Sequence, residues 1–356
     1  MQVKCSLFNH WHLCFTWLPC YGRRVKRNVV IWQKEMKNYF ILLFTCLLLI
    51  LGCNKENSIE PPIQVEDFWR STNCPQTTVH EIKECSNGFL FANTSNGILK
   101  SIDNGDNWNY CLTKANLEWA IAISKNDRIA IVDYGNLLIS SDYGNTWENK
   151  QLKTDSIDFF LISNDICFDE EERIFIATDR GVIRSEDLGS NWVLLTEGMF
   201  IKNIRSVYVT NDNNKIIAGA NSSLNALYHS SNRGDTWLEN QSIVHQIIFC
   251  LAEDSVGNLF AAGNGVLFYS VDKGISWIVI ATANDIFSNV ITVNDNIYVA
   301  FAAGSVFYSD DGSINYKDLN SGFDKSKGTC LHYSKSGFLF SGTVYDGIYK
   351  SKKTLN

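Results

Sequence analysis

The sequence lacks the cysteine and histidine spacings of a metal-binding protein. After Cys53 it holds six cysteines and four histidines, with no C-x-x-C pair and no histidine at zinc-ligand spacing. We therefore expect no metal and no cofactor. Three cysteines recur at similar points of different segments, which favours small buried strand residues, and a disulfide from Cys74 to Cys85 or Cys111 is the alternative. The recurring three are Cys167, Cys250 and Cys330.

An apolar run long enough to cross a membrane comfortably is also missing. The run at residues 39–51 has thirteen residues, whereas a transmembrane helix needs roughly 20. It follows Lys34 and Lys37 and ends at Gly52, which is the pattern of a secretory signal peptide. Residues 50–53 (ILGC) resemble the lipobox of bacterial lipoproteins, and this resemblance implies that Cys53 becomes the lipidated first residue of the mature chain.

The signal-peptide pattern, together with the residues before it (the leader, residues 1–52), divides the chain into four predicted segments. Residues 1–35 are predicted to be an extra extension or the result of a mis-assigned start codon, because Met36 begins a plausible signal peptide at residues 36–52. Residues 53–65 form a polar tether, and residues 66–356 form the exported domain. The alternative is an uncleaved anchor with a basic cytoplasmic flank. Both organisations predict a bacterial envelope protein, and a lipid would hold it to the outer membrane on the periplasmic or the surface side.

Basic charge is scarce after the leader. Residues 1–52 contain seven Lys or Arg and one acidic residue, which leaves 24 basic against 37 acidic side chains, a net charge of −13. A surface this acidic repels polyanions, so we do not expect nucleic acid as a partner. We expect a monomer that meets the membrane only through its lipid.

A repeated motif is the strongest signal in the sequence. The pattern Ser-x-Asp-x-Gly-x-x-Trp occurs four times without mismatch, once with Asn in place of Asp, and once in a degraded form. From Ser101 the serines step by 39, 45, 45, 40 and 39 residues, and another 42 residues lead to Ser351. A period of about 40 residues is typical of propeller blades. The copies are Ser101/Asp103/Gly105/Trp108, Ser140/Asp142/Gly144/Trp147, Ser185/Asp187/Gly189/Trp192, Ser230/Asn232/Gly234/Trp237, Ser270/Asp272/Gly274/Trp277 and the degraded Ser309/Asp311/Tyr316 with Gly312.

Each repeat predicts four short strands, because short alternating runs are separated by Gly, Asn and Asp. The motif falls at the turn between the third and fourth strands, where Ser and Asp bond backbone amides, Gly permits a positive φ and Trp is buried. Its predicted role is therefore structural. We predict an all-β, seven-bladed β-propeller of four-stranded blades. Residues 67–71 (DFWRS) resemble an outer strand, and pairing them with the last blade would close the ring.

These repeats resemble the BNR or Asp-box family, which includes sialidases, xyloglucanase-type glycoside hydrolases, sortilin-like receptors and the photosystem II assembly factor group. The resemblance covers residues 66–351, and residues 177–185 (ATDRGVIRS) are especially similar to the xyloglucanase and assembly-factor style of blade. It implies a binding face opposite the motifs, built from the second-to-third and fourth-to-first strand loops. Ligand-binding candidates there are Trp119, Tyr134, Arg180, Arg205 and Tyr345, and the acidic candidates are Glu118, Asp133, Asp155, Asp158, Asp179 and Asp346.

A hydrolase of this family is the alternative to a binding protein. Asp133, Asp179 and Asp346 occupy equivalent loops and could supply the two carboxylates of a glycosidase, although turn capping beside glycine is their more ordinary role. A sialidase needs an arginine triad, and only seven arginines follow the leader. Repeats of about 41 residues also leave only short loops. We expect a non-enzymatic scaffold for a protein or a glycan, with hydrolysis of a neutral polysaccharide as the alternative and sialidase activity as the less favoured one.

Overall fold

The described part of the chain is all β and belongs to one compact unit, Glu66–Asn356. Its residues form strands, turns and connections, and none of them forms a helix that could cross a membrane. The predicted leader, Cys53 and the tether lie outside the described residues. The computed structural model describes residues 66–113, 120–133, 135–154, 161–222, 227–243, 246–294, 296–310, 316–323 and 328–355.

Five antiparallel sheets have four strands each. They repeat one plan, in which three consecutive strands follow one another by short turns and a fourth strand forms the outer edge. From the inner to the outer strand they are β2 (Val79–Glu84), β3 (Leu90–Thr94), β4 (Gly97–Ser101) and β5 (Asn109–Thr113); β6 (Ile121–Ile123), β7 (Ile129–Asp133), β8 (Asn136–Ser140) and β9 (Glu148–Gln151); β10 (Ser163–Phe168), β11 (Ile174–Thr178), β12 (Gly181–Ser185) and β13 (Val193–Leu195); β14 (Ile204–Val209), β15 (Ile216–Ala220), β16 (Leu227–Ser230) and β17 (Leu238–Glu239); and β24 (Gly328–Tyr333), β25 (Leu339–Thr343), β26 (Ile348–Ser351) and β1 (Trp69–Ser71).

The sixth sheet has six strands and contains two sequence repeats, those with Ser270 and Ser309. β20 pairs with β19 through residues 278–286 and with β21 through residues 287–293. No Gly or Pro interrupts residues 278–293, so one strand continues from the end of one repeat into the next. The prediction of seven separate four-stranded blades is therefore wrong, because the described strands form six sheets. The strands of the sixth are β18 (Ile248–Glu253), β19 (Leu259–Ser270), β20 (Ile278–Val293), β21 (Asn296–Phe301), β22 (Ser305–Ser309) and β23 (Lys317–Asp318).

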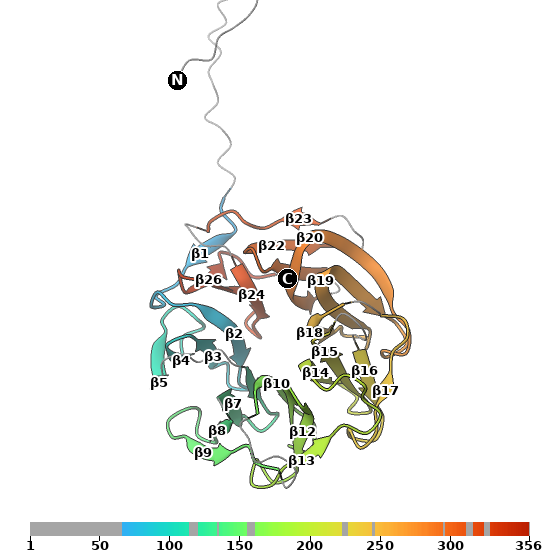
Figure 1. Cartoon of the computed structure of the whole chain (residues 1–356). Helices are drawn as coiled ribbons and strands as arrows, with labels where there is room; N and C mark the ends of the chain where they lie inside the picture. Colours follow the sequence, from blue (N-terminus) through green and yellow to red (C-terminus); the bar gives the residue numbers. More distant parts are fainter. Residues whose placement is uncertain are drawn as a thin grey trace, which may run out of the picture. The chain divides into compact units, whose positions relative to one another are not determined.

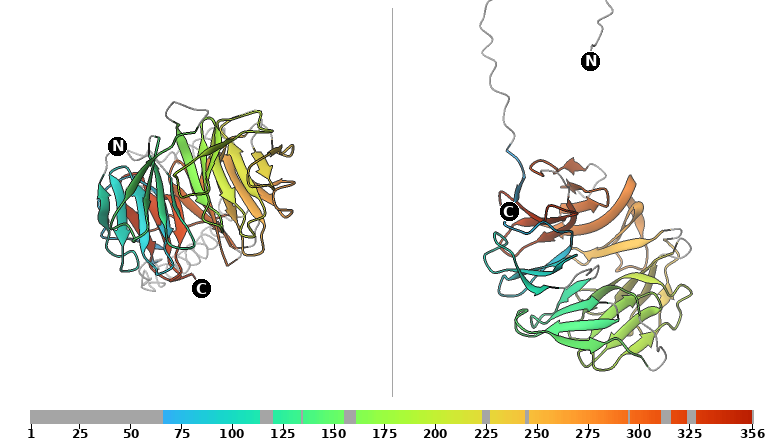
Figure 2. Two further views of the ribbon diagram at one scale, coloured as in Figure 1. Left: turned by 90° about the horizontal axis from the view of Figure 1, so that it is seen from below. Right: turned by 60° about the vertical axis from the view of Figure 1, so that its left-hand side comes forward.

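The sheets are arranged radially around a common axis and form a propeller ring (Figure 1). Inner strands contact one another in the order β2, β6, β10, β14, β18, β20 and β24, and β24 contacts β2. In the side view the strands run between the two faces of the ring (Figure 2). The apolar core lies between neighbouring sheets, as where Leu90 and Leu99 pack with Phe340 and Ile348. One sheet alone could not bury these faces, and stacking buries them.

The serine and glycine of the repeated motif form the same hydrogen-bonded turn in five repeats. In the second copy the Ser140 Oγ donates to Asp142 Oδ1 (2.8 Å) and accepts from the Gly144 amide (2.8 Å). Hydrogen bonds from the hydroxyl and amide of Thr146 lower the pKa of Asp142 to about 2. The glycine has a φ of 78°, a conformation that a side chain disfavours. These side chains are therefore occupied within their own turns.

The motif glycines and most motif tryptophans are packed inside the sheets. All five glycines are buried with a positive φ, and three tryptophans donate from the indole nitrogen to the carbonyl of their own glycine. The glycines and their φ values are Gly105 (80°), Gly144 (78°), Gly189 (88°), Gly234 (84°) and Gly274 (83°). The donating pairs are Trp108 to Gly105 (3.0 Å), Trp192 to Gly189 (3.2 Å) and Trp277 to Gly274 (3.1 Å).

Two motif tryptophans depart from this arrangement. The indole nitrogens of Trp147 and Trp237 are buried but have no hydrogen-bond partner in the described part of the chain. Trp237 is 2% exposed, whereas Trp147 is only partly buried, so the prediction of a buried tryptophan in every motif is wrong at Trp147. The Trp237 amide bonds the Glu197 carbonyl of the preceding repeat. For Trp147, the segment that follows the outer strand of the preceding repeat is residues 114–119, and it lies outside the described residues.

A lysine or arginine side chain of the preceding sheet forms a hydrogen bond with each of the five described motif turns. Its side-chain nitrogen donates to the backbone carbonyl of the fourth motif residue, which itself has a positive φ. Such bonds cross the seams between successive sheets and complement the apolar packing there. The pairs are Lys100 to Tyr143 (2.7 Å), Lys150 to Leu188 (2.9 Å), Arg184 to Arg233 (2.7 Å), Lys215 to Lys273 (3.1 Å) and Lys350 to Asn104 (2.7 Å).

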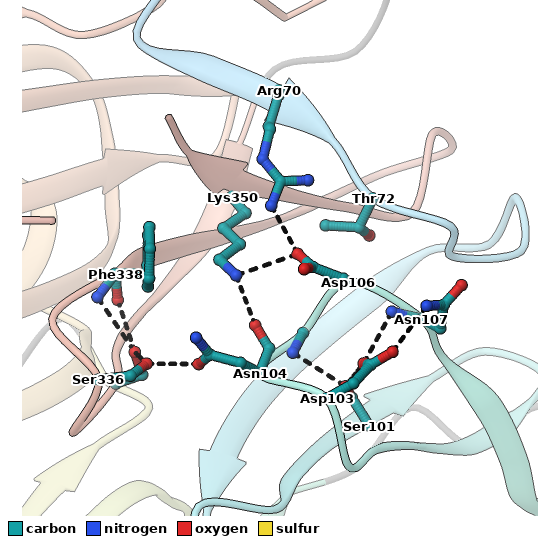
Figure 3. Close-up of polar contacts among 12 residues, drawn as sticks. Arg70, Thr72, Ser101, Asp103, Asn104, Asp106, Asn107, Ser336, Phe338 and Lys350 are labelled. Carbon is teal, nitrogen blue, oxygen red and sulfur yellow. Dashed lines mark hydrogen bonds and ion pairs between the residues drawn. The ribbon is translucent and has the colours of Figure 1, made fainter. Parts of the chain in front are cut away.

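The N-terminal strand closes the ring. β1 pairs antiparallel with β26, with Arg70 opposite Lys350, so the predicted pairing of this segment with the last repeat is confirmed. At the seam between the last and first repeats, Asp106 accepts from both cations, at 2.5 Å from Arg70 and 3.0 Å from Lys350 (Figure 3). The closure therefore joins both ends of the propeller through one carboxylate.

Candidate functional site

The ring has two faces with different content. The motif turns and the turns between first and second strands lie on one face, which we name the motif face. The turns between second and third strands and the connections between sheets lie on the other, which we name the loop face. Of the predicted ligand-binding residues, the structure describes Arg180, Arg205 and Tyr345, and these three lie toward the loop face.

The motif residues contribute to turns and packing rather than to a binding surface. Their serines, and the aspartates or asparagine that follow, bond within their own turns, although Asn232 also lines a cavity on the motif face. In the degraded copy, Asp311 and Gly312 lie outside the described residues. The motif glycines and tryptophans are buried or partly buried, and the two unpaired indole nitrogens, those of Trp147 and Trp237, are themselves covered from solvent. These residues are Gly105, Trp108, Gly144, Trp147, Gly189, Trp192, Gly234, Trp237, Gly274 and Trp277.

The three candidate catalytic aspartates have surroundings that suit turns. Asp133 is 3% exposed at the end of β7. Asp179 Oδ1 accepts from the Ile162 amide (3.2 Å), and its Oδ2 lies 3.5 Å from the guanidinium of its neighbour Arg180. The Asp346 amide donates to Thr343 Oγ1 (2.9 Å), just before Gly347 at a φ of 74°. The Asp179 carboxylate thus bonds the adjacent connection, and Asp346 is joined to its own turn through its backbone amide. The side chains that cap these two turns are the threonines, since Thr178 Oγ1 accepts from the Arg180 amide as Thr343 Oγ1 does from the Asp346 amide.

The other predicted loop-face residues are only partly described. Trp119, Tyr134, Glu118, Asp155 and Asp158 lie outside the described residues. Arg180 and Tyr345 are exposed, the latter at 72%. Arg205 is exposed at the start of β14, and its guanidinium lies 5.9 Å from the centroid of the Phe249 ring. Arg205 therefore has an aromatic partner from the neighbouring inner strand, which the sequence pattern did not indicate.

Inner strands of five sheets and the corresponding part of β20 share a β-bulge near the loop face. The register shifts occur between residues 79 and 81, 163 and 165, 204 and 206, 248 and 250, 287 and 289, and 328 and 330, and none is recorded in β6. A bulge redirects a side chain and often accompanies a binding site. The bulged residues with described side chains, which we name the bulge ring, are His80, Asn164, Arg205, Phe249 and Ser288.

The bulge ring combines several kinds of side-chain chemistry at equivalent positions. His80 Nε2 lies 3.1 Å from Ser95 Oγ, and Asn164 Nδ2 donates to the Ile204 carbonyl (2.7 Å). Imidazole, amide, guanidinium and aromatic groups suit recognition of a peptide or a sugar, because they offer both hydrogen bonds and a flat apolar surface. Alternating strand patterns miss such residues, because each bulge shifts the alternation by one position.

The residue after each bulge links one inner strand to the next. Glu81 Oε2 accepts from the Ile121 amide (3.1 Å), Asp165 Oδ2 from the Val207 amide (2.9 Å), and Asn289 Oδ1 from the Leu331 amide (3.2 Å). Cys250 and Cys330 occupy this same position. Cys167 lies two residues beyond Asp165 and so does not share that position. All three cysteines lie in inner strands, as predicted, but only Cys330 is buried, whereas Cys167 and Cys250 are partly buried.

The thiols of the described domain are all free. Cys74, Cys85, Cys111, Cys167, Cys250 and Cys330 form no disulfide, so the pairing of Cys74 with Cys85 or Cys111 is not made. Burial raises the pKa of the Cys85 and Cys330 thiols to about 12. These two buried thiols are therefore protonated and poor nucleophiles at neutral pH.

Asp165 gives the inner ring a pH-dependent stability. Desolvation, with the charge of Glu81, raises its pKa from 3.8 to about 7. Because the folded-state pKa exceeds the unfolded one, this carboxyl favours the folded state most below about pH 4 and loses that contribution as the pH rises to about 7. Asp165→Asn should remove this part of the pH dependence, which urea titrations of both proteins between about pH 4 and 8 would measure. Parallel pH profiles for the two proteins would show that Asp165 does not titrate in this range.

Comparison with known proteins identifies a fold class. The chain matches no protein-family model and no curated protein. Solved structures with the same fold include the extracellular domain of the one component system BT4673 from B. thetaiotaomicron (TM-score 0.66, 13% identity, 80% of this chain and 40% of that chain). Others are YCF48 bound to D1 peptide (0.64, 15%, 81% and 97%) and the GH74 xyloglucanase from Xanthomonas campestris (0.63, 14%, 79% and 53%).

The likeness to these structures defines the chain as a β-propeller and extends no further than the fold. The chain spans about 40% of the length of the BT4673 domain and about half of the xyloglucanase, but nearly all of YCF48. One shared fold thus occurs in the extracellular domain of a one component system, in a protein bound to a peptide and in a xyloglucanase, so the fold alone assigns no role to this chain.

Proposed function

We propose that this chain is an extracytoplasmic binding propeller of the Asp-box repeat type, anchored by a lipid on Cys53, whose loop face holds a protein or a glycan without hydrolysing it. The repeat type is supported by five copies of one turn with the same serine-to-glycine hydrogen bond. The envelope location is supported by the signal-peptide pattern of residues 36–52 and by the lipobox-like residues 50–53.

The proposal of a non-enzymatic role rests on the burial and the hydrogen bonds of the candidate catalytic aspartates. A glycosidase needs two open carboxylates on opposite sides of the scissile bond. Asp133 is buried, and Asp179 is engaged by an amide and a guanidinium from its own surroundings. The bulge ring instead presents Arg205 beside Phe249, a pairing suited to the face of a sugar ring or to a peptide side chain.

The test combines binding with turnover. Three purified proteins would be compared: the wild type, Asp179→Ala and the double variant Arg205→Ala/Phe249→Ala. Each would be used to retrieve binding partners from an envelope extract, and each would be tested for binding to a panel of neutral and acidic polysaccharides. We expect that the wild type releases no aryl aglycone from aryl-glycosides. We also expect a protein partner or glycan that Asp179→Ala binds as the wild type does, and whose binding falls about tenfold or more in the double variant. Turnover by the wild type that is lost in Asp179→Ala would instead show a glycoside hydrolase.

A further inference from the structure

Large aliphatic side chains gather at the surface of one repeat, the repeat with Ser270. Eleven large hydrophobic side chains are exposed in the described part of the chain, and five of them belong to residues 256–279, where they are 54–76% exposed. Exposed hydrophobic residues that are scattered singly are ordinary on a folded domain, whereas a cluster of them indicates a contact surface. We name these five residues the apolar patch: Val256, Val271, Ile275, Ile278 and Val279.

The apolar patch occupies one end of its repeat. Val256 lies in the β18–β19 turn, and Val271 and Ile275 lie in the motif turn, so these three residues belong to the motif face. Ile278 and Val279 begin β20. Residues 278–282 of β20 pair with β19 on one side and with no second strand in the described part of the chain. The patch therefore lies where the motif face meets the outer edge of the sheet.

The motif turn itself does not require aliphatic residues. Its backbone is the common one, since Ser270 Oγ accepts from the Gly274 amide (2.9 Å) as in the other four described turns. Among these five turns, only the fifth is aliphatic both at the second motif position and at the position after the glycine. The second position holds Ile102, Ser141, Glu186, Ser231 and Val271 in turn, and the position after the glycine holds Asp106, Asn145, Ser190, Asp235 and Ile275.

The charged groups beside the apolar patch are bonded within the protein. Asp272 accepts from the amide (2.8 Å) and the hydroxyl (2.6 Å) of Ser276, inside the motif turn. Asp254 accepts from the amides two and four residues later (3.0 and 2.8 Å), inside the β18–β19 turn. Lys273 forms an ion pair with Asp212. Contact through the aliphatic side chains therefore leaves these polar bonds in place.

A lipid bilayer suits this patch better than a protein partner does. The centres of protein interfaces are rich in Trp, Tyr and Arg, whereas the patch consists of Val and Ile alone. Aliphatic side chains that project from turns can enter the boundary between headgroups and acyl chains, where bound apolar faces lie about 5–10 Å deep. A lipid on Cys53 would also keep a bilayer close, because the thirteen residues 53–65 can span at most about 45 Å.

We propose that the apolar patch inserts into the surface of the membrane that carries the anchor, as a second contact beside the lipid on Cys53. This inference rests on one part of the proposed function, that the chain is held at a membrane. It adds a contact to the lipid, which the sequence pattern indicated as the sole link to the bilayer. The motif face of the Ser270 repeat then lies toward the membrane and the loop face away from it, so the loop face stays open to its partner.

Hydrogen exchange on vesicles tests the contact. The exported chain from residue 54 onward, with an N-terminal hexahistidine segment in place of the lipid, would be held on phosphatidylcholine vesicles through a nickel-chelating lipid and compared with the same protein free in solution. Residues 66–356 form one compact unit, so the exchanged anchor leaves the domain whole. We expect the amides of residues 254–258 and 270–282 to exchange about threefold or more slowly on the vesicles. Those of the second motif turn, residues 140–147, should exchange equally in both states.

A double variant and a matched control locate the contact. Val271→Ser/Ile275→Asn gives the fifth motif turn the residues of the second, Ser141 and Asn145, and should abolish the slowing on vesicles. Ile102→Ser removes an equally exposed aliphatic side chain from the first motif turn and should behave as the wild type does. Near-ultraviolet circular dichroism would establish that each variant is folded. Should the double variant lose its fold, the wild type on and off vesicles decides alone.

Three results would overturn the proposal. The first is equal exchange of the patch amides on vesicles and in solution, and the second is a slowing that the folded double variant retains. The third is a slowing in solution that grows with protein concentration, since a second copy of the chain would then cover the patch. Mass spectrometry of Cys53 in the native protein tests the lipid separately, and an unmodified Cys53 would contradict the proposed anchor while the vesicle result stood.

Discussion

Replacing Trp69 with alanine is expected to lower the free energy of unfolding by about 3–5 kcal/mol, the range for a large aromatic side chain removed from a core. Trp69 is 1% exposed, its ring stacks on Phe323 with centroids 5.1 Å apart, and its indole nitrogen donates to the Leu319 carbonyl. It also begins β1, so its loss loosens the strand that covers β26. Urea unfolding followed by tryptophan fluorescence and circular dichroism would measure the change.

Two control variants separate this effect from general damage. Trp69→Phe keeps most of the apolar burial and removes only the indole donor, so it should cost about 1–2 kcal/mol. Tyr345→Ala removes a side chain that is 72% exposed, and it should change stability by no more than about 0.5 kcal/mol. If Trp69→Ala resembled Tyr345→Ala, β1 would not be part of the folded ring.

Replacing Lys350 with methionine is expected to cost about 2–4 kcal/mol, because the change removes a buried ammonium together with its two charge-assisted hydrogen bonds, to the Asn104 carbonyl and to the half-exposed Asp106 carboxylate. Lys350 is 2% exposed; its Nζ donates to the Asn104 carbonyl (2.7 Å) and Asp106 (3.0 Å) and lies 4.1 Å from the centroid of the Phe338 ring. Methionine keeps the apolar stem while removing the charge. Among the described residues, Asp106 would then keep Arg70 as its ion-pair partner (Figure 3).

The matched control is Lys100→Met, one repeat along the ring. Lys100 has the same place in its strand and donates to the Tyr143 carbonyl (2.7 Å), but no carboxylate pairs with it among the described residues. Its loss should cost about 1–2 kcal/mol. An effect of Lys100→Met as large as that of Lys350→Met would show that the doubly bridged Asp106 adds nothing to closure.

The regular part of this fold could be predicted because its determinants are local. Ser, Asp, Gly and Trp at fixed spacing build one turn from contacts within eight residues, so the repeats and their strands follow from the sequence. The closing strand was also predictable, since Trp69 belongs to a segment like those that end each repeat. The number of separate sheets was not predictable, because it depends on whether β20 breaks at residues 283–285. Asn284 and Asp285 suit a turn there as well, but no Gly or Pro interrupts the strand, and the sequence pattern does not decide between the two.

The burial of the motif tryptophans marks the limit of such local prediction. Trp108 and Trp277 bond the carbonyls of Gly105 and Gly274 within their own turns, as a local motif implies. Trp147 has the same spacing to its glycine, yet it is only partly buried and its indole nitrogen bonds nothing in the described chain. How deeply a motif tryptophan is covered therefore depends on neighbouring segments, which the motif does not specify.

The candidate sites depend on contacts between repeats, and periodicity carries little information about these. The bulge ring arises from a register shift that strand alternation cannot display, so of its members only Arg205 was anticipated. The side-chain links from one inner strand to the next likewise join distant residues, since Asp165 and the Val207 amide that it accepts from are 42 positions apart.

The loop face and the motif face exist as described only if the ring is closed by β1. Hydrogen exchange at the amides of β1 tests this closure most directly. In the intact, purified protein the amides of β1 that bond to β26 should exchange as slowly as those of β26 itself, because both strands open only with the whole ring. Exchange of the β1 amides as rapid as in an unstructured chain, with β24 to β26 still protected, would contradict the closure.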